Sequence, residues 1–161
     1  MGSNRATGAY CLPEGVLISI PGSEKPVEQL AVGDLILSYN PQTKQVEEAA
    51  ILTLAVQHHH VLYELDFGST KIKVAEDQPF YSTGKYYSVV KNDTHGVQTK
   101  AFAVGQKIDF LVDGKLKKVK LKEIKKIETC ENTHTITGLD KNRLYFANGA
   151  CISTETVTQD H

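Results

Sequence analysis

The chain has 161 residues, of which 40% are hydrophobic, and a formal net charge of −1 at pH 7. This length is typical of one globular domain with its own core, and the near-neutral charge excludes a general attraction to nucleic acid or acidic membranes. No apolar run is long enough to cross a membrane, and residues 1–10 lack the apolar stretch of a signal peptide. We therefore expect a single monomeric domain, cytoplasmic as expressed, with no membrane or nucleic-acid partner.

Strand patterns dominate from Gly15 onward. Val, Ile, Tyr, Phe and Thr are frequent and turn residues recur about every 8–12 positions, which indicates an all-β sandwich or barrel. The segment Pro26–Asp34 predicts a single helical turn. Strands are predicted at 15–20, 34–40, 49–56, 61–67, 71–75, 107–112, 117–129, 133–139 and 143–149, with turns at 21–26, 41–44, 67–70 and 113–115.

One internal repeat suggests two related halves. The segment "EQLAVGDLI" at Glu28–Ile36 recurs as "KAFAVGQKI" at Lys100–Ile108, and both copies lead into a predicted strand. The polar segment Lys85–Lys100 is expected to be a loop that connects the halves.

The cysteines are too few and too scattered for a disulfide framework, since there are three of them. Cys130 and Cys151 lie in strand-like surroundings and are expected to be small buried residues. Cys11 differs because it lies where the polar leader gives way to structured sequence.

Two other patterns suggest ligands only weakly. In "QHHHV" at Gln57–Val61, adjacent histidines of a strand point to opposite faces, so the three cannot converge on one ion. Cys130 and His134 lack a second pair at zinc-finger spacing. We therefore expect no metal and no cofactor. The basic run Lys115–Lys126 could attract phosphates, but its alternating apolar residues favour a solvated strand or hairpin face, so nucleic-acid binding is a minor hypothesis.

Four blocks in order resemble the Hint domains of inteins, bacterial intein-like proteins and the Hedgehog autoprocessing domain. They are Cys11–Asn40, "IKVAEDQPFYSTGKYYS" at Ile72–Ser88, "AFAVGQKI" at 101–108, and "RLYFANGACIST" at Arg143–Thr154. The bacterial intein-like and prophage-associated versions are the most similar. The resemblance implies an all-β horseshoe of two pseudo-symmetric halves. It also implies a Hint domain at 11–154, between a leader at 1–10 and a tail at 155–161.

In that family the first Cys or Ser attacks the preceding carbonyl and converts an amide into a (thio)ester. A Thr-x-x-His in the second block polarises and protonates this peptide, and a closing His assists the Asn whose cyclisation cuts the chain. The resemblance places Cys11 at the nucleophile and Tyr10 at the attacked carbonyl. The other positions are replaced, by Ala75 and Gln78 in the second block and by Ser153 and Thr154 at the close.

These replacements remove specific chemistry. Ala75 has no hydroxyl, Gln78 donates a hydrogen bond without shuttling a proton, and Thr154 has no amide to cyclise. Glu155 stands where splicing inteins carry Cys, Ser or Thr. Cys151 shares a strand side with Ser153, which leaves a substitute thiol role open, and Thr154 and Thr156 are alternative hydroxyls.

The resemblance thus implies a self-processing domain, with the flanking segments of its own precursor as partners. It is expected to be inactive or limited to slow thiol-assisted cleavage before Cys11, since losing both second-block groups slows the first step by about 10⁴-fold or more. The alternative is a non-catalytic structural or interaction module that keeps the scaffold. Replacement at all four positions favours natural degeneration, with an engineered knock-out as the other explanation.

Overall fold

The computed structural model describes residues 10–94 and 96–155. The expected leader and tail therefore lie outside the described residues, except for Tyr10 and Glu155, and so does Thr156. Within the described part of the chain, no helix is long and apolar enough to cross a membrane.

The described residues are almost entirely strands, as expected. The strands are β1 (Leu12–Pro13), β2 (Leu17–Ile20), β3 (Ser23–Pro26), β4 (Leu35–Asn40), β5 (Gln45–Asp66), β6 (Lys71–Val74), β7 (Phe80–Ser82), β8 (Lys85–Ser88), β9 (Asp93–Thr94), β10 (Val97–Ala101), β11 (Lys107–Val112), β12 (Lys115–Lys120), β13 (Glu123–Leu139), β14 (Leu144–Ala147) and β15 (Ala150–Ser153). The predicted helical turn is a short 3₁₀ helix at Val27–Gln29. All strands belong to one hydrogen-bonded network with the main order β1-β13-β5-β4-β14-β15-β7-β8-β10-β9.

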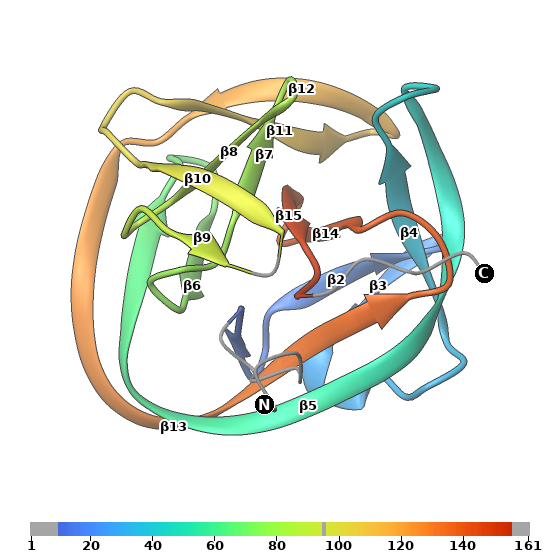
Figure 1. Cartoon of the computed structure of the whole chain (residues 1–161), viewed down its shortest axis with the longest axis horizontal. Coiled ribbons are helices and arrows are strands. Elements are labelled where there is room, and N and C mark those ends of the chain that lie inside the picture. Colours follow the sequence, from blue (N-terminus) through green and yellow to red (C-terminus); the bar gives the residue numbers. More distant parts are fainter. Residues whose placement is uncertain (1–9, 95, 156–161) are drawn as a thin grey trace.

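Two long strands frame the molecule. Strands β5 and β13 pair antiparallel from Glu123↔Asp66 to Leu139↔Ile51, and they curl around the periphery (Figure 1). Strands β14 and β15 lie inside this frame and form a hairpin at the Asn148-Gly149 turn. The closing block of the sequence therefore lies at the centre of the fold.

Four sequence expectations for local structure are wrong. The strand expected at 117–129 is divided between β12, which ends at Lys120, and β13, which begins at Glu123 and also contains the strand expected at 133–139. Residues 23–26, expected as part of a turn, form β3, which pairs with β2. The two strands expected at 49–56 and 61–67 are one continuous strand, β5, because its pairing with β13 extends through the histidines. The segment Lys85–Lys100, expected as a loop, contains strands, and β8 and β10 pair in parallel. A local pattern predicts single strands, whereas each of these features depends on which strands pair with one another.

The internal repeat is a repeated turn. In the first copy, the Gly33 amide donates to the Ile51 carbonyl at 2.8 Å and the Ile51 amide donates to the Asp34 carbonyl at 2.9 Å. The Asp34 amide closes the turn by donating to the Ala31 carbonyl at 3.0 Å. Gly33 has a φ of 95°, a conformation that glycine adopts without a steric penalty.

The second copy has the same bonds. The Gly105 amide donates to the Leu121 carbonyl at 2.7 Å, the Leu121 amide to the Gln106 carbonyl at 2.9 Å, and the Gln106 amide to the Ala103 carbonyl at 3.0 Å. Gly105 has a φ of 96°. The matching pattern supports two pseudo-symmetric halves.

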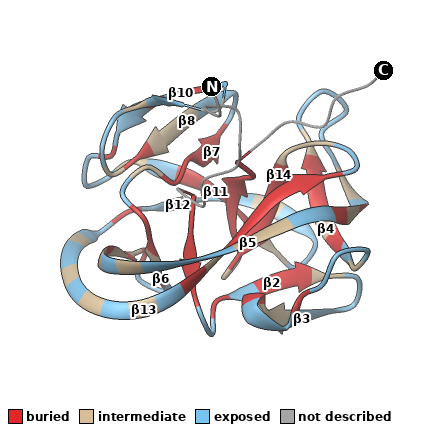
Figure 2. Ribbon diagram, turned by 60° about the horizontal axis from the view of Figure 1, so that its bottom comes forward, coloured by how far each residue is buried: buried red, intermediate tan, exposed pale blue. Residues whose placement is uncertain are grey.

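The core is apolar and continuous. Figure 2 shows the buried residues gathered on the inner strands β7, β11 and β14, while β5 and β13 alternate between exposed and partly buried positions along their outer stretch. Large side chains from both halves meet in the core, and the rings of Phe67 and Phe110 lie 4.8 Å apart. A second cluster contains Tyr39, Tyr81 and Cys151.

The expected burial is confirmed for the basic run and for Cys151 but not for Cys130. The lysines of the basic run are exposed on the β11–β12 hairpin and the start of β13, while Leu121 is buried, as the alternating pattern predicts. Cys151 is buried as expected, but Cys130 is exposed, so that prediction is wrong for Cys130. A bulge in β13 displaces Cys130 from regular pairing.

Candidate functional site

Cys11 lies at the centre of the molecule, directly before β1. Strand β1 pairs with β13 so that Leu12 is opposite His134, which brings Cys11 beside Thr135. The Thr135 hydroxyl donates to Cys11 Sγ at 3.2 Å. Tyr10 and Cys11 both have 0% exposure, so the peptide between them is enclosed in the protein.

The second block lies next to this peptide. It forms the connection between β6 and β7, and the Ala75 amide donates to the Cys11 carbonyl at 3.2 Å. Gln78 is fully buried, and its Nε2 donates to the Ser153 carbonyl at 3.0 Å and to the Pro79 carbonyl at 3.2 Å. The Gln78 side chain therefore connects the second block to the closing block.

The closing block completes the cluster. Strand β15 pairs with β7 at Ile152↔Phe80, and the Ser153 amide donates to the Pro79 carbonyl at 3.2 Å. Ser153 and Thr154 both have 0% exposure. The structure therefore brings together all five positions singled out from the sequence. They are Cys11, Ala75, Gln78, Ser153 and Thr154.

Arg143 holds the closing pair in place. Its Nε donates to Ser153 Oγ at 2.8 Å and its Nη2 donates to the Thr154 carbonyl at 3.1 Å. The Ser153 hydroxyl in turn donates to the Thr154 carbonyl at 2.8 Å, and the Thr154 amide donates back to the Arg143 carbonyl at 2.7 Å. We call these three residues the Arg143 clasp. Charge-assisted bonds of this kind are the stronger hydrogen bonds of proteins.

Two buried polar atoms near the centre lack a partner among the described residues. They are Gln78 Oε1 and the Tyr145 hydroxyl, and the rest of each side chain is fully buried. Most buried polar atoms in proteins are hydrogen-bonded, because an unsatisfied one costs about 1–3 kcal/mol. Gln78 Oε1 and the Tyr145 hydroxyl therefore add polarity to an otherwise largely apolar interior.

Burial and carboxylates control the ionisation of the site. Burial is the main cause that raises the pKa of Cys11 to about 11, while hydrogen bonds from Thr135 and Thr133 oppose the shift. Burial also raises the pKa of Asp77 to about 6, with further contributions from Glu76 and Glu155. Asp77 and Glu155 both interact electrostatically with Tyr10 and Cys11. The thiol is therefore protonated at neutral pH, with an acidic pair nearby.

Sequence reasoning missed the residues that support the centre. Thr133, Thr135, Arg143 and Asp77 were not expected there, because their roles depend on pairing between distant strands. Thr133 extends the network further, since its Oγ1 lies 2.7 Å from Nδ1 of His59. The alternation of hydroxyls in "THTIT" was the available signal, since every second residue of a strand faces the same side.

Cys151 lies in a different cluster from Cys11. It packs in the cluster of Tyr39, Tyr81 and Phe146, and burial raises its pKa well above the usual range, with a further contribution from Asp109. This environment favours a packed thiol over the substitute nucleophile that the sequence left open.

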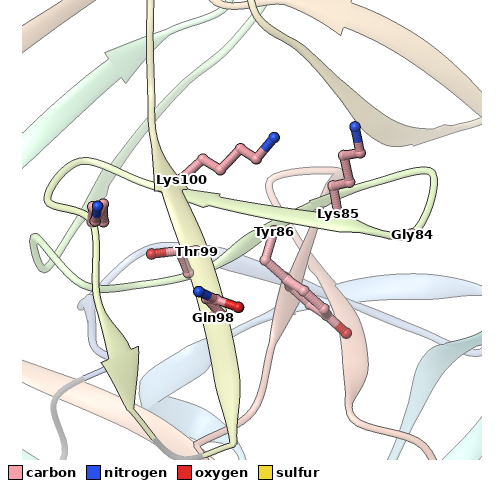
Figure 3. A pocket seen from close by; sticks show the side chains of 7 residues that line it. Gly84, Lys85, Tyr86, Gln98, Thr99 and Lys100 are labelled. Atoms are coloured by element: carbon pink, nitrogen blue, oxygen red, sulfur yellow. The ribbon is translucent and has the colours of Figure 1, made fainter.

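A pocket of about 400 Å³ is lined by the paired strands β8 and β10 and their flanking residues (Figure 3). The side chains of Lys85 and Lys100 extend from these two strands, and Tyr86 interacts electrostatically with Arg143. The pocket's lining residues are Gly84, Lys85, Tyr86, Lys91, Gln98, Thr99 and Lys100. The lysine side chains that line this pocket would attract acidic groups.

Several solved structures resemble this arrangement over most of their length. The bacterial intein-like domain from Clostridium thermocellum is 21% identical, with a TM-score of 0.72 over 89% of this chain and 97% of that one. A DnaB intein from Synechocystis sp. PCC 6803 is 15% identical, with a TM-score of 0.74 over 90% of this chain and 98% of that one. The chain has the Hint fold.

A third Hint structure, the PabCDC21-1 intein, is 13% identical, with a TM-score of 0.68 over 89% of this chain and 98% of that one. No family model and no curated protein matches the sequence. The all-β class and the resemblance to intein-like domains are therefore confirmed through the three-dimensional structure. The roles of individual residues remain predictions.

Proposed function

We propose that this Hint domain is an intein-like self-processing domain whose chemistry is reduced to its first step. In that step the Cys11 sulfur attacks the carbonyl carbon of Tyr10, a C–S bond forms and the C–N bond breaks. The thiol proton goes to the nitrogen of Cys11, which becomes a free amine. The product is a thioester that an external thiol or hydroxylamine cleaves.

The enclosure of the Tyr10–Cys11 peptide is the observation that carries this proposal. A packing cysteine could lie anywhere in the core, but this one follows an enclosed peptide and accepts a hydrogen bond from Thr135. The hydroxyl of Thr135 stabilises the thiolate form, which is the nucleophilic form of a cysteine. Asp77, whose pKa burial raises to about 6, interacts electrostatically with Cys11 and opposes ionisation of its thiol.

The proposed activity does not include the family's cyclisation step, which cuts the chain at the closing block. Thr154 has no side-chain amide, so it cannot cyclise and cut the chain after itself. The Ser153 hydroxyl donates a hydrogen bond to the Thr154 carbonyl and accepts one from Arg143 Nε, so it is fixed in the clasp. The domain therefore does not splice, and its partner is the segment of its own precursor before Cys11. We place the domain at residues 11–154.

The first step is slow in this proposal. The alanine at position 75 removes a hydroxyl donor, and Gln78 cannot protonate the departing nitrogen, so the rate falls by about 10⁴-fold or more relative to a complete centre. The raised pKa of Cys11 slows the step further near neutral pH, since little of the thiol is ionised there.

Intact-mass measurement of the full chain tests this function. Incubation with dithiothreitol or hydroxylamine should release a fragment ending at Tyr10, and the cleaved fraction should grow with pH. The Cys11→Ala variant should stay whole, while Cys151→Ser, which removes the other buried thiol, should cleave like the wild type. A wild-type mass that stays whole through days of either treatment removes the enzymatic claim.

A non-catalytic scaffold is the second candidate, and the Arg143 clasp favours it. A charged side chain that fixes the two replaced positions stabilises the fold without serving cleavage. Under this proposal Cys11→Ala leaves the biological role intact. Loss of that role on the same change would contradict the scaffold function.

A further inference from the structure

Three side chains with metal-ligating atoms gather on the outer face of the β5–β13 pair, away from Cys11. Nitrogen atoms of His58 and His60 and the sulfur of Cys130 all lie within 4.8 Å of one another. The side chains are exposed, so an ion reaches them without any opening of the fold. We infer that His58, His60 and Cys130 form a binding site for a divalent transition-metal ion of the zinc class.

The strand geometry explains why two of the three histidines converge. Positions 58 and 60 are two residues apart in β5, so their side chains share a face, while His59 points to the other face and contacts Thr133. The sequence argument that three adjacent histidines cannot share an ion therefore holds. It overlooked that alternate histidines can, once a ligand on a neighbouring strand completes the set.

A bulge in β13 supplies that ligand. Val61 pairs with Glu128 and His59 pairs with Glu131, so two residues of β13 oppose the single residue His60 of β5. A bulge of this kind changes the direction of a side chain, and here it belongs to the stretch that contains Cys130. The exposure of Cys130, which the sequence did not predict, places its sulfur beside the two imidazoles.

The hydrogen bonds of His58 prepare it to bind a metal. Its Nδ1 lies 3.1 Å from Oδ1 of Asn132, the residue directly opposite in β13. An N–H at Nδ1 that donates to this amide oxygen leaves Nε2 with a free lone pair, which is the form that ligates metals. Nε2 lies 2.9 Å from Cys130 Sγ, and in the metal-free protein it accepts a hydrogen bond from the thiol.

The ligand set fits zinc better than magnesium or calcium. Two imidazole nitrogens and one thiolate suit soft and borderline ions, whereas magnesium and calcium prefer oxygen ligands. In a tetrahedral zinc site the ligand atoms are about 3.4 Å apart between nitrogens and about 3.6 Å apart between nitrogen and sulfur. The exposed side chains reach these separations by small rotations, and a water molecule takes the fourth position.

Binding converts the thiol into a thiolate. The metal–sulfur bond forms, the S–H bond breaks, and the proton leaves to the solvent, so that one proton is released for each ion bound. The ion then joins β5 to β13 across the bulge. Because it binds the folded chain, it should raise the melting temperature by roughly 5–10 °C at free zinc about 100-fold above Kd.

Calorimetric titration of the reduced full chain with zinc chloride tests the site. We expect one ion per chain and, from titrations in buffers of different ionisation enthalpy, about one proton released. Cys130→Ala, His58→Ala and His60→Ala should each weaken binding by on the order of 100-fold, and Asn132→Ala by about 10- to 100-fold. These positions are exposed, so the melting temperatures of the metal-free variants should stay close to the wild type.

Matched controls separate this site from the other histidines and thiols. His59→Ala changes the same residue type on the opposite face, His134→Ala removes a histidine that pairs with Glu14, and Cys11→Ala removes the proposed nucleophile. All three should bind zinc like the wild type. Cobalt(II) should give a thiolate charge-transfer band in the wild type and in Cys11→Ala, and no such band in Cys130→Ser. Equal affinity in Cys130→Ala, or loss of binding in Cys11→Ala, would overturn the inference.

Discussion

The two ends of the proposed centre differ in what their polar groups contact. On the Cys11 side, the Thr135 hydroxyl donates a hydrogen bond to the sulfur of the proposed nucleophile. On the Thr154 side, Arg143 donates hydrogen bonds to Ser153 and to the Thr154 carbonyl. We therefore expect changes on the first side to alter the proposed cleavage, and changes on the second side to alter stability.

We expect the largest effect, an increase in the cleavage rate, from restoring the missing groups of the second block. Ala75→Thr combined with Gln78→His should speed thiol-induced cleavage before Cys11 by about 10⁴-fold, because it returns an acid–base residue and a hydroxyl donor. The rate at which the cleaved mass appears in dithiothreitol measures the effect. The same pair of changes in a Cys11→Ala background should give no cleavage. An unchanged rate would mean that the geometry of the centre, and not its missing groups, limits the reaction.

Substitutions on the Thr154 side should change the free energy of unfolding instead of the cleavage rate. Arg143→Ala removes the clasp from Ser153 and Thr154, and the free energy of unfolding should fall by about 2–4 kcal/mol, because charge-assisted bonds are lost and buried acceptors remain. Urea denaturation at constant slope measures the change. Arg143→Lys, which keeps the charge but not the planar fork, should lose less. If both variants unfold like the wild type, the clasp is not a stabilising feature.

The acidic group beside the centre should give a pH-dependent effect. The pKa of Asp77 is raised from 3.8 to about 6, so its favourable contribution is complete below pH 4 and is lost as the pH rises through 6. Asp77→Asn should therefore match the wild type in stability near pH 3.5. At pH 8 it should exceed the wild type by up to about 2 kcal/mol, allowing for the partial solvent exposure of Asp77.

Thermal unfolding across this pH range checks that sign. Asp113→Asn, in the exposed turn between β11 and β12, is the matched control for the loss of a carboxylate. The pH-dependent change of the position 77 variant is measured relative to this control. A variant at position 77 that is destabilised at pH 8 would contradict the raised pKa.

We expect the smallest effect from removing the hydrogen bond that Thr135 donates to Cys11 Sγ. Thr135→Val removes the donor to Cys11 Sγ and should lower the free energy of unfolding by about 1 kcal/mol. It should also slow cleavage, because the pKa of Cys11 rises further without this donor. Thr137→Val, two residues on in β13 and bonded to Thr53, should cost similar stability without changing the cleavage rate. Equal cleavage rates for the two variants would remove Thr135 from the mechanism.

Short sequence patterns were enough to predict the positions of the candidate site and of the repeated turn. The block order located Cys11, Ala75, Gln78, Ser153 and Thr154, which the structure brings together, and the repeated Ala-Val-Gly segment identified the paired turns. It could not predict the Arg143 clasp, because this contact depends on how the β14–β15 hairpin meets β7. It missed the strands in Lys85–Lys100 for the same reason, since parallel pairing of β8 with β10 is not visible in local composition. The exposure of Cys130 depends on a single bulge that no residue pattern marks.

The repeated turn explains how so few identical residues can preserve this architecture. Asp34 supports its turn with a side-chain bond to the Ala31 amide, whereas Gln106 at the equivalent place bonds to the Lys107 carbonyl. The backbone bonds are nevertheless the same in both copies. The two corners therefore share a path of the main chain and the Ala-Val-Gly segment, while the side chain after the glycine differs. A comparison of side chains misses this similarity, because it lies mainly in the backbone.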